Sequence, residues 1–358
     1  MPTTFPPIVC TLGTTTDDPQ VILGMVAAGM GMARVNTAYG TIDQLAERMD
    51  LVRAVCRTPL MVDLKGRQLR VDCTTEKMDG ATGKMVERPC RYPIAEGDLI
   101  FVGFQVGPVR FNHDFEDDLQ VGDRITFENG TIQTRVADAE SEAIEPLDSA
   151  VLLEVLDAGS GQMTPQMGAN VPGRHLHLPS LTDRDRAVLE LGVERRAEAY
   201  ALSFVQQPED LLLVHHELVA RGDDEAMLIA KIENQQGIDR LGAIVRATRD
   251  LGRPLAVMIA RGDLFVELPI VDLPAVQNKL VGLCKSLDVP SIVATGLLLS
   301  MQNSPRPSRS EVCDVAAAAR SGANSFMLSD ETSNGVNPVL AIRTLSQLVH
   351  AYRPQRPV

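Results

Sequence analysis

Short apolar runs alternate with longer amphipathic segments along most of the chain. The apolar runs are PIVCTLG, GMARVN, LMVDLKG, AEAYALSF, MLIAKIE, PLAVMIARGD, SIVATG and NSFMLSDE. Residues with helical periodicity follow them, for example Ile42–Val55 and Leu241–Leu251. Strands that alternate with helices indicate βαβ units and a parallel sheet. Eight strands of this kind close a (β/α)8 barrel, so the predicted fold class is α/β.

The interval between the third and fourth strands interrupts this repeat. Lys65, after the third strand, lies 138 residues before Ser203, after the fourth, whereas the next strand ends recur every 30 to 32 residues. Inside the gap, DRITFENGTIQTRV alternates apolar and polar residues around Asn-Gly, which is typical of a β-hairpin. We therefore expect an all-β domain, residues 72–168, inserted into a barrel that is made of residues 1–71 and 169–358.

Charge and cysteine content narrow the classes of partner. There are 34 basic and 47 acidic residues, and this net charge of −13 argues against a nucleic-acid partner. The six cysteines are sparse and lack a Cys-x-x-Cys spacing, which favours a reducing compartment. The N-terminal MPTTFPPIVC lacks the pattern of a signal peptide, and no run reaches 18 apolar residues. We expect a cytoplasmic protein with no membrane partner.

The run MLIAKIE ends in an alternating pair of opposite charges. Because side chains alternate along a strand, Lys231 and Glu233 share one face while Ile232 takes the other. In a barrel of this kind, functional groups gather at the C-terminal ends of the strands. Glu233 and Asp263 offer two carboxylates from neighbouring strands, a set that suits Mg²⁺ or Mn²⁺. Lys231 and Arg34 add two cations, so the predicted site suits an oxyanion or a phosphoryl group.

Two further patterns bear on this site. In ARGDL, a short helix that begins at Gly262 would offer free N–H groups to a substrate carboxylate. Lys231 and Glu233 also fit an ordinary ion pair, and that alternative stays open for either residue alone. Their coincidence with further polar residues on consecutive strands favours the metal site.

Ser308 and Glu311 have the spacing of a helix capping box.

Recognisable motifs follow one another in a fixed order along the chain. They are IVCTLG, GMARVNTAYG, VDLKGRQLR, GANVPG, LSFVQQPED, AKIENQQGID, MIARGDLFVELP, IVATGLLLSM, PRPSRSEVCDVA and MLSDETSNG. In this order they resemble the pyruvate kinase family, and the combination of KIEN, ARGDL and PRPSR is highly specific for its fold. The resemblance implies a TIM barrel and identifies the insertion as the family's mobile lid. The family's C-terminal regulatory domain has no counterpart here, so regulation by a sugar phosphate is not expected.

The resemblance also implies roles for individual residues. It makes Glu233 and Asp263 the ligands of the divalent metal. It makes Lys231 the group at the transferring phosphoryl and enolate oxygen, with Arg34 on the phosphate. Thr295 would lie near the methylene carbon that is protonated. These roles imply Mg²⁺ or Mn²⁺ as cofactor.

Further positions match the family's substrate and cation sites. The substrate set is Ser203, Ala260, Arg261, Gly262, Asp263 and Thr295. The residues that match part of the family's potassium site are Asn36, Asp63 and the Leu64 carbonyl, so K⁺ is a second expected cofactor. Arg70 is retained on the nucleotide side. The family's tetramer uses the missing domain in part, so a homo-oligomer is compatible with the sequence.

The departures from the family pattern lie mainly on the nucleotide side. Tyr39 stands where the family has a nucleotide-side His, and Ala38 where it has a potassium-ligand Ser. Met167 and Asn334 each stand where the family has a Lys, so ADP would lose cationic contacts worth about a kcal/mol or more each. His177 also replaces an Asp. We therefore expect weakened ADP binding.

Three classes of function follow. The favoured prediction is a pyruvate kinase-like phosphotransferase that moves a phosphoryl group between phosphoenolpyruvate and ADP. The alternative is a metal-dependent lyase, aldolase or decarboxylase that acts on a 2-oxo acid through a pyruvate enolate and needs no nucleotide. A non-catalytic binding protein is least favoured, because it would not need to retain the residues of the substrate side together.

Overall fold

The computed structural model describes residues 5–78, 84–139, 141–142, 144–145 and 147–353. The chain folds into two compact units. The first unit contains residues 1–66, 180–264 and 271–358, and the second contains residues 67–179 and 265–270. The second unit thus begins and ends outside the range 72–168 that the sequence suggested. The chain termini of the proposed barrel, residues 1–4 and 354–358, lie outside the described residues.

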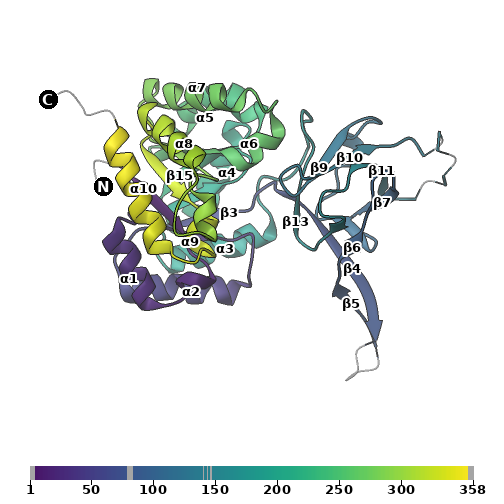
Figure 1. Cartoon of the computed structure of the whole chain (residues 1–358), viewed down its shortest axis with the longest axis horizontal. Helices are drawn as coiled ribbons and strands as arrows, with labels where there is room; N and C mark the ends of the chain where they lie inside the picture. The colour runs from purple at the N-terminus through teal and green to yellow at the C-terminus, as the bar shows by residue number, and fades with distance from the viewer. Residues whose placement is uncertain (1–4, 79–83, 140, 143, 146, 354–358) are drawn as a thin grey trace. The chain divides into compact units, whose positions relative to one another are not determined.

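The first unit is a closed barrel of eight parallel strands, as the apolar runs predicted (Figure 1). The strands are β1 (Ile8–Thr11), β2 (Met32–Asn36), β3 (Leu60–Leu64), β14 (Ala199–Leu202), β15 (Met227–Ile232), β16 (Leu255–Ala260), β17 (Ser291–Ala294) and β18 (Ser325–Leu328). Each strand pairs with its successor, and β1 pairs with β18 to close the ring, with Ile8 beside Phe326. We call the C-terminal ends of these strands the mouth and their N-terminal ends the base.

Helices surround the barrel and connect its strands. They are α1 (Pro19–Ala28), α2 (Ile42–Val55), α3 (Asp183–Glu194), α4 (Pro208–Ala220), α5 (Gln235–Asp250), α6 (Arg261–Glu267), α7 (Leu273–Ser286), α8 (Arg309–Arg320), α9 (Asp330–Ser333) and α10 (Pro338–Tyr352). The predicted capping box is confirmed, since Ser308 and Glu311 satisfy each other's backbone at the start of α8. The last residues of α6 belong to the second unit. Every helix in the described ranges is too short or too polar to span a bilayer.

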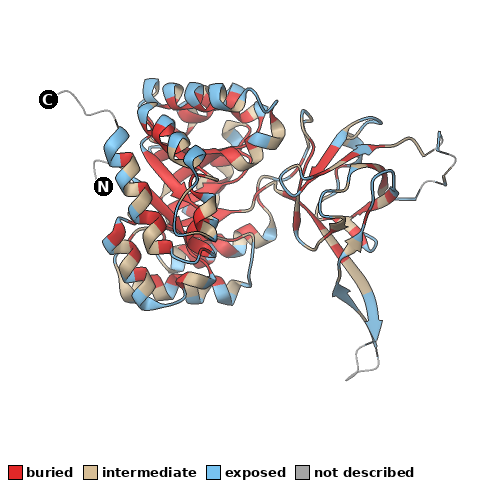
Figure 2. Cartoon of the chain, viewed as in Figure 1, coloured by how far each residue is buried: buried red, intermediate tan, exposed pale blue. Residues whose placement is uncertain are grey.

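The barrel interior is filled by small and flexible apolar side chains. Ala199, Ala201 and Ala256 pack with Met32, Met61, Met258 and Met327 in one buried cluster. Figure 2 shows this buried interior in red, with exposed residues on the outer faces of the helices. Alternation along β15 directs Met227, Ile229 and Lys231 to one side of the strand. The same face therefore carries a thioether at the base and an ammonium group at the mouth.

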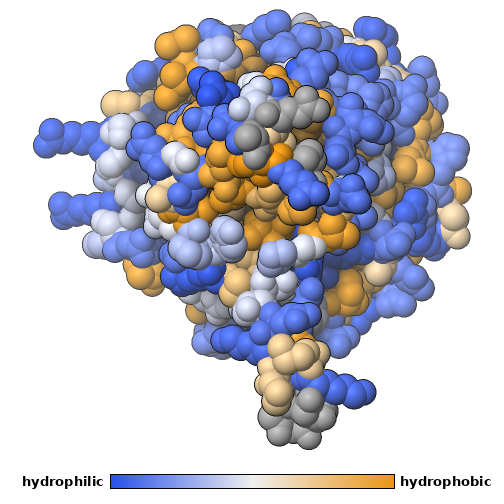
Figure 3. Space-filling view, turned by 90° about the vertical axis from the view of Figure 1, so that its right-hand side faces the viewer, coloured by the Kyte–Doolittle hydropathy of each residue, from blue (hydrophilic) through white to orange (hydrophobic). Residues whose placement is uncertain are grey.

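The second unit is built mainly of strands. They are β4 (Leu69–Met78), β5 (Met85–Pro89), β6 (Tyr92–Pro93), β7 (Leu99–Phe104), β8 (Val109–Phe111), β9 (Arg124–Phe127), β10 (Ile132–Val136), β11 (Ala150–Asp157), β12 (Gln162–Met163) and β13 (Met167–Asn170). The hairpin predicted at Asn-Gly is confirmed, because β9 and β10 pair antiparallel across it. Stacked and edge-on contacts join Phe104, Phe111, Phe115 and Phe127 in its core. Figure 3 faces this unit and shows apolar side chains among polar ones on its surface.

Candidate active site

Lys231 is the centre of a buried polar cluster at the mouth. Its Nζ lies 3.2 Å from Glu233 Oε1 and 3.2 Å from Asp63 Oδ1. The same ammonium donates a hydrogen bond of 2.6 Å to Ser203 Oγ, which in turn donates to the Leu64 carbonyl at 2.9 Å. Burial would lower the pKa of Lys231, but the charges of Asp63 and Glu233 raise the pKa above its ordinary value. Lys231 is therefore charged at neutral pH despite its burial.

Arg34 joins this cluster through Asp63. Its Nε lies 2.6 Å from Asp63 Oδ2, and its Nη1 donates to Thr11 Oγ1 at 2.8 Å. Thr11 in turn donates to the Leu328 carbonyl at 2.9 Å, which ties the first barrel strand to the last. Burial would raise the pKa of Asp63, but Lys231 and Arg34 overcome that effect and hold the pKa below its ordinary value. One carboxylate thus fixes both cations.

Glu233 lies directly after β15 and is almost fully buried. Its Oε2 accepts a hydrogen bond of 2.6 Å from the Phe204 backbone N–H. Burial raises the pKa of Glu233 to about 7; Lys231 opposes this rise, and the negative charge of Asp263 adds to it. The ion pair between Lys231 and Glu233 that the sequence left open is present, yet burial and the charge of Asp263 still keep the pKa of Glu233 above its ordinary value.

The donors of this cluster fit a divalent cation. Glu233 and Asp263 contribute carboxylate oxygens, and Mg²⁺ commonly takes one or two protein carboxylates and fills its other positions with water and substrate oxygens. Among the described residues, no group of three or more His, Cys, Asp and Glu side chains forms a metal centre. An ion here would accordingly need oxygens from its substrate as well as from the protein.

Thr295 has a strained backbone that Arg261 holds in place. Thr295 follows β17 with φ of +75°, which is unfavourable for a β-branched residue. The Arg261 guanidinium donates to the Thr295 carbonyl at 2.7 Å from Nη2 and 3.1 Å from Nε. Its Nη1 forms an ion pair of 2.7 Å with Asp314 and donates to Gln277. Arg261 therefore positions Thr295 through its side chain.

The segment from Ala260 to Asp263 turns from strand into helix. The helix α6 begins at Arg261, one residue before the predicted start at Gly262. A Cβ atom at Gly262 would lie 3.1 Å from Thr295 Cγ2, so glycine allows the two loops to approach closely. Asp263 stands in the first turn of this helix, which directly follows β16, and β16 pairs with the strand β15 that precedes Glu233.

The remaining predicted residues are the potassium candidates in the barrel and Arg70 in the second unit. The Asn36 side chain accepts from the Ala38 N–H at 3.2 Å, and the Leu64 carbonyl already accepts from Ser203. Arg70 belongs to the second unit, where its Nη2 donates to Gln68. The structure thus brings together most of the substrate-side residues within the barrel, and it surrounds the potassium candidates with protein donors.

Several residues of the cluster went unnoticed in the sequence. They are Thr11, Asp314, Gln277 and Asp185. Asp185 accepts from the Lys65 and Gly66 backbone N–H groups, and buried Glu331 accepts from those of Leu298 and Ser329. Asp185 and Glu331 lie in the helices α3 and α9, and the sequence does not reveal which backbone donors such buried acids meet.

Comparison with known proteins identifies the family. Residues 5–342 match the model of the pyruvate kinase barrel domain. The chain belongs to the pyruvate kinase family. Pyruvate kinase from Sporosarcina psychrophila is 30% identical over 347 residues, and that from Staphylococcus aureus strain USA300 is 32% identical over 352 residues. Both alignments cover 95% of this chain but only 56% of the relative, so the chain spans about half the length of these pyruvate kinases.

A cavity adjoins the cluster in this member of the pyruvate kinase family. It has a volume of about 750 Å³ and reaches the cluster at Thr11 and Asn36. Its charged lining residues are Asp17, Glu47, Arg48 and Asp330. Arg48 is already paired with Asp17 at 2.9 Å. The three carboxylates outnumber the one cation, so the lining carries an excess of negative charge. It also includes the neutral residues Tyr39 and Asn334.

Proposed function

We propose that the protein is a pyruvate kinase-like, divalent-metal-dependent enzyme that transfers a phosphoryl group between phosphoenolpyruvate and ADP. The single observation that carries this proposal is the buried position of charged Lys231 between Asp63 and Glu233. Family membership supports the same reaction, although the curated relatives are much longer than this chain. The six cysteines are all unpaired, which supports a reducing, cytoplasmic compartment.

Lys231 and Arg34 would stabilise the charge that develops on the reacting oxygens. Both side chains are buried, and a fixed cation in a buried site stabilises an oxyanion far more than a cation in water does. Asp63 and Ser203 hold the ammonium before substrate arrives, so Lys231 is oriented in advance of the reaction. Lys231 would contact the transferring phosphoryl group and the enolate oxygen, and Arg34 would contact the phosphate.

Glu233 and Asp263 are the proposed ligands of Mg²⁺ or Mn²⁺, with K⁺ near Asn36, Asp63 and the Leu64 carbonyl. A bound divalent ion would supply Lewis-acid polarisation of the phosphoryl and enolate oxygens. The N–H groups between Ala260 and Asp263, with Ser203, are the proposed contacts of the substrate carboxylate. Thr295 is the proposed residue beside the methylene carbon, and its strained backbone fits a position that Arg261 maintains.

Phosphorus NMR would test this proposal. Phosphoenolpyruvate is followed with Mg²⁺, K⁺ and ADP, and ATP is expected from the wild type and not from Lys231→Ala. Lys285→Ala, at an exposed position on α7, is the matched control and should retain full activity. Thermal unfolding of each variant separates loss of chemistry from loss of folding. Absence of ATP from folded, metal-binding protein would contradict phosphotransfer.

A second candidate is a metal-dependent lyase, aldolase or decarboxylase that acts on a 2-oxo acid without nucleotide. The acidic cavity beside the cluster favours it, because Asp17, Glu47 and Asp330 would repel a polyphosphate and Arg48 is already paired. Lys231 would stabilise the pyruvate enolate that is released when the carbon–carbon bond breaks. Exchange of pyruvate methyl protons with deuterium, measured without ADP, tests this candidate. Exchange that strictly requires nucleotide would contradict it.

A further inference from the structure

The base of the barrel contains a cavity of about 930 Å³, at the opposite end of the strands from the candidate active site. This volume lies in the range of small-molecule sites in proteins. Its apolar wall consists of Phe5, Pro6, Met32, Pro59, Met227, Pro254 and Pro290. Phe5 and Met227 are half-buried and pack on the interior cluster of the barrel that contains Met32. The cavity therefore opens directly onto the barrel core.

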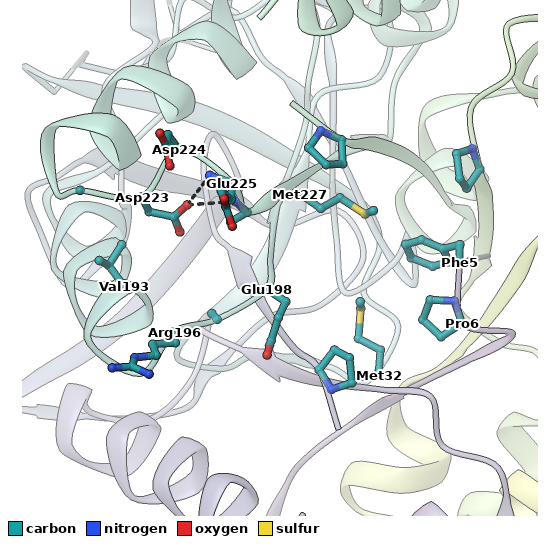
Figure 4. A pocket seen from close by; sticks show the side chains of 16 residues that line it. Phe5, Pro6, Met32, Val193, Arg196, Glu198, Asp223, Asp224, Glu225 and Met227 are labelled. Carbon is teal, nitrogen blue, oxygen red and sulfur yellow. Dashed lines mark hydrogen bonds between the residues drawn. The ribbon is translucent and has the colours of Figure 1, made fainter. Parts of the chain in front are cut away.

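The opposite wall of the cavity is acidic. Figure 4 shows Glu198, Asp223, Asp224 and Glu225 on one side, with the methionines, Phe5 and Pro6 on the other. Arg196 is the one cationic side chain among the lining residues, all of which belong to the described part of the chain. The two walls together would suit a molecule with an apolar body and a positively charged head.

The pairing of these acids shows which of them remain available. Glu198 is paired with Arg53 at 2.9 Å. Asp223 accepts from the backbone N–H groups of Glu225 and Ala226. Asp224 and Glu225 are exposed, and neither forms an ion pair within the described residues. These two carboxylates are the charges that an incoming cation would meet first.

The backbone around the cavity disfavours an anion. Pro59, Pro254 and Pro290 stand directly before β3, β16 and β17, and proline has no N–H to donate. The N–H groups of Glu198 and Met227 are also used, since they donate to the carbonyls of Leu60 and Glu198. An anionic ligand would find few free donors here and several carboxylates.

We propose that this cavity binds a small organic cation, namely a primary ammonium group on an aromatic or aliphatic body. The ammonium group lies against Asp224 and Glu225, and the apolar body rests on Met32, Met227 and Phe5. Methionine side chains adapt to the shape of a ligand because the thioether is flexible and polarisable. This site does not depend on the reaction proposed for the mouth.

The test uses protein labelled with ¹³C in its methionine methyl groups, with the signals of Met32 and Met227 assigned by Met→Leu substitution. Three probes of matched size are titrated: 2-phenylethylamine, 2-phenylethanol and 3-phenylpropionate. The amine is expected to shift both signals in a saturable manner, and the alcohol to bind at least about tenfold more weakly, because it lacks the charge. The carboxylate is expected to give no saturable shift.

Charge variants sharpen this test. The double variant Asp224→Asn/Glu225→Gln is expected to weaken amine binding about three- to tenfold and to leave alcohol binding unchanged, because exposed pairs are modest in strength. The matched control Asp43→Asn/Glu209→Gln removes the same charge from the exposed first turns of α2 and α4 and should bind the amine within about twofold of wild type.

Three results would overturn the proposal. Equal binding of all three probes would mean an apolar cavity without preference for a cation. Absence of shifts at Met32 and Met227 up to the solubility limit of the amine would mean that the cavity is not a ligand site. Shifts that follow protein concentration without any probe would mean that a second copy of the chain covers the base.

Discussion

At the mouth of the barrel, Arg34, Asp63, Lys231 and Glu233 are buried and bonded to one another, whereas at the base Asp224 and Glu225 are exposed and lie beside an apolar wall. Taking a charge out of water is costly, so the mouth has to pair each charge, and the pairing fixes the geometry in advance. Exposed carboxylates carry no such cost. Removal of a charge should consequently have large effects at the mouth and small ones at the base.

The largest effect is expected from Asp63→Asn. This change removes the carboxylate that Arg34 and Lys231 share, and loss of one partner from a buried pair typically costs about 3 kcal/mol or more. Asp224→Asn at the base should lower the free energy of unfolding by no more than about 0.5 kcal/mol. Urea denaturation of both variants measures the difference. Similar losses in the two variants would contradict the contrast between the two ends.

An intermediate effect is expected from Asp314→Ala. Without this carboxylate, Arg261 loses its ion pair and no longer holds the strained Thr295 carbonyl as firmly. We expect kcat to fall about tenfold while KM changes little, because the proposed role of Thr295 is in protonation and not in binding. Steady-state kinetics of phosphoryl transfer from phosphoenolpyruvate to ADP measures both constants. A rise in KM at unchanged kcat would assign Asp314 to substrate binding instead.

The smallest effect is expected on the pH dependence of stability, from Glu311 in the first turn of α8. Burial would raise the pKa of Glu311, but hydrogen bonds from Ser300 and Ser308 hold the pKa below its ordinary value. A carboxyl whose folded pKa is lowered contributes stability above its unfolded pKa of about 4.3 and loses it as pH falls through the folded value.

Wild type should accordingly lose stability more steeply below about pH 4 than Glu311→Gln does. The difference should stay below about 1 kcal/mol, because Glu311 is partly exposed and water screens it. Glu225→Gln at the base is the matched control and should keep the wild-type slope. Thermal unfolding between pH 3 and about 6 measures the stability of each variant. Parallel curves for Glu311→Gln and wild type would contradict a stabilising role of the Glu311 carboxylate.

The sequence predicted those parts of the fold that depend on local periodicity. Alternation in MLIAKIE was sufficient to bring Lys231 and Glu233 to one face, and the Asn-Gly pair was sufficient for the hairpin of β9 and β10. The ends of the second unit could not be predicted as well from the sequence. Residues 265–270 belong to it, although the sequence placed them within the barrel range 169–358.

Partners that are distant in sequence could not be predicted. Thr11 bonds to the Leu328 carbonyl across 317 residues, and Asp314 reaches Arg261 from another helix. Thr11 lies in IVCTLG and Asp314 in PRPSRSEVCDVA, but these motifs do not reveal which distant partners the two side chains meet. The cavity at the base was not predicted for a similar reason, because its prolines precede separate strands and its methionines begin two others, and each is unremarkable alone.

The bond between Thr11 and Leu328 has a consequence for how the protein is made. Arg34 is oriented by Thr11, and Thr11 is oriented by the final barrel strand, which leaves the ribosome long after the first. Contacts with such separation form late in folding, since the loop between them must close first. A nascent chain that lacks β18 leaves Thr11, and through it Arg34, without this support. The arrangement of Arg34 at the mouth is therefore complete only after β18 has left the ribosome.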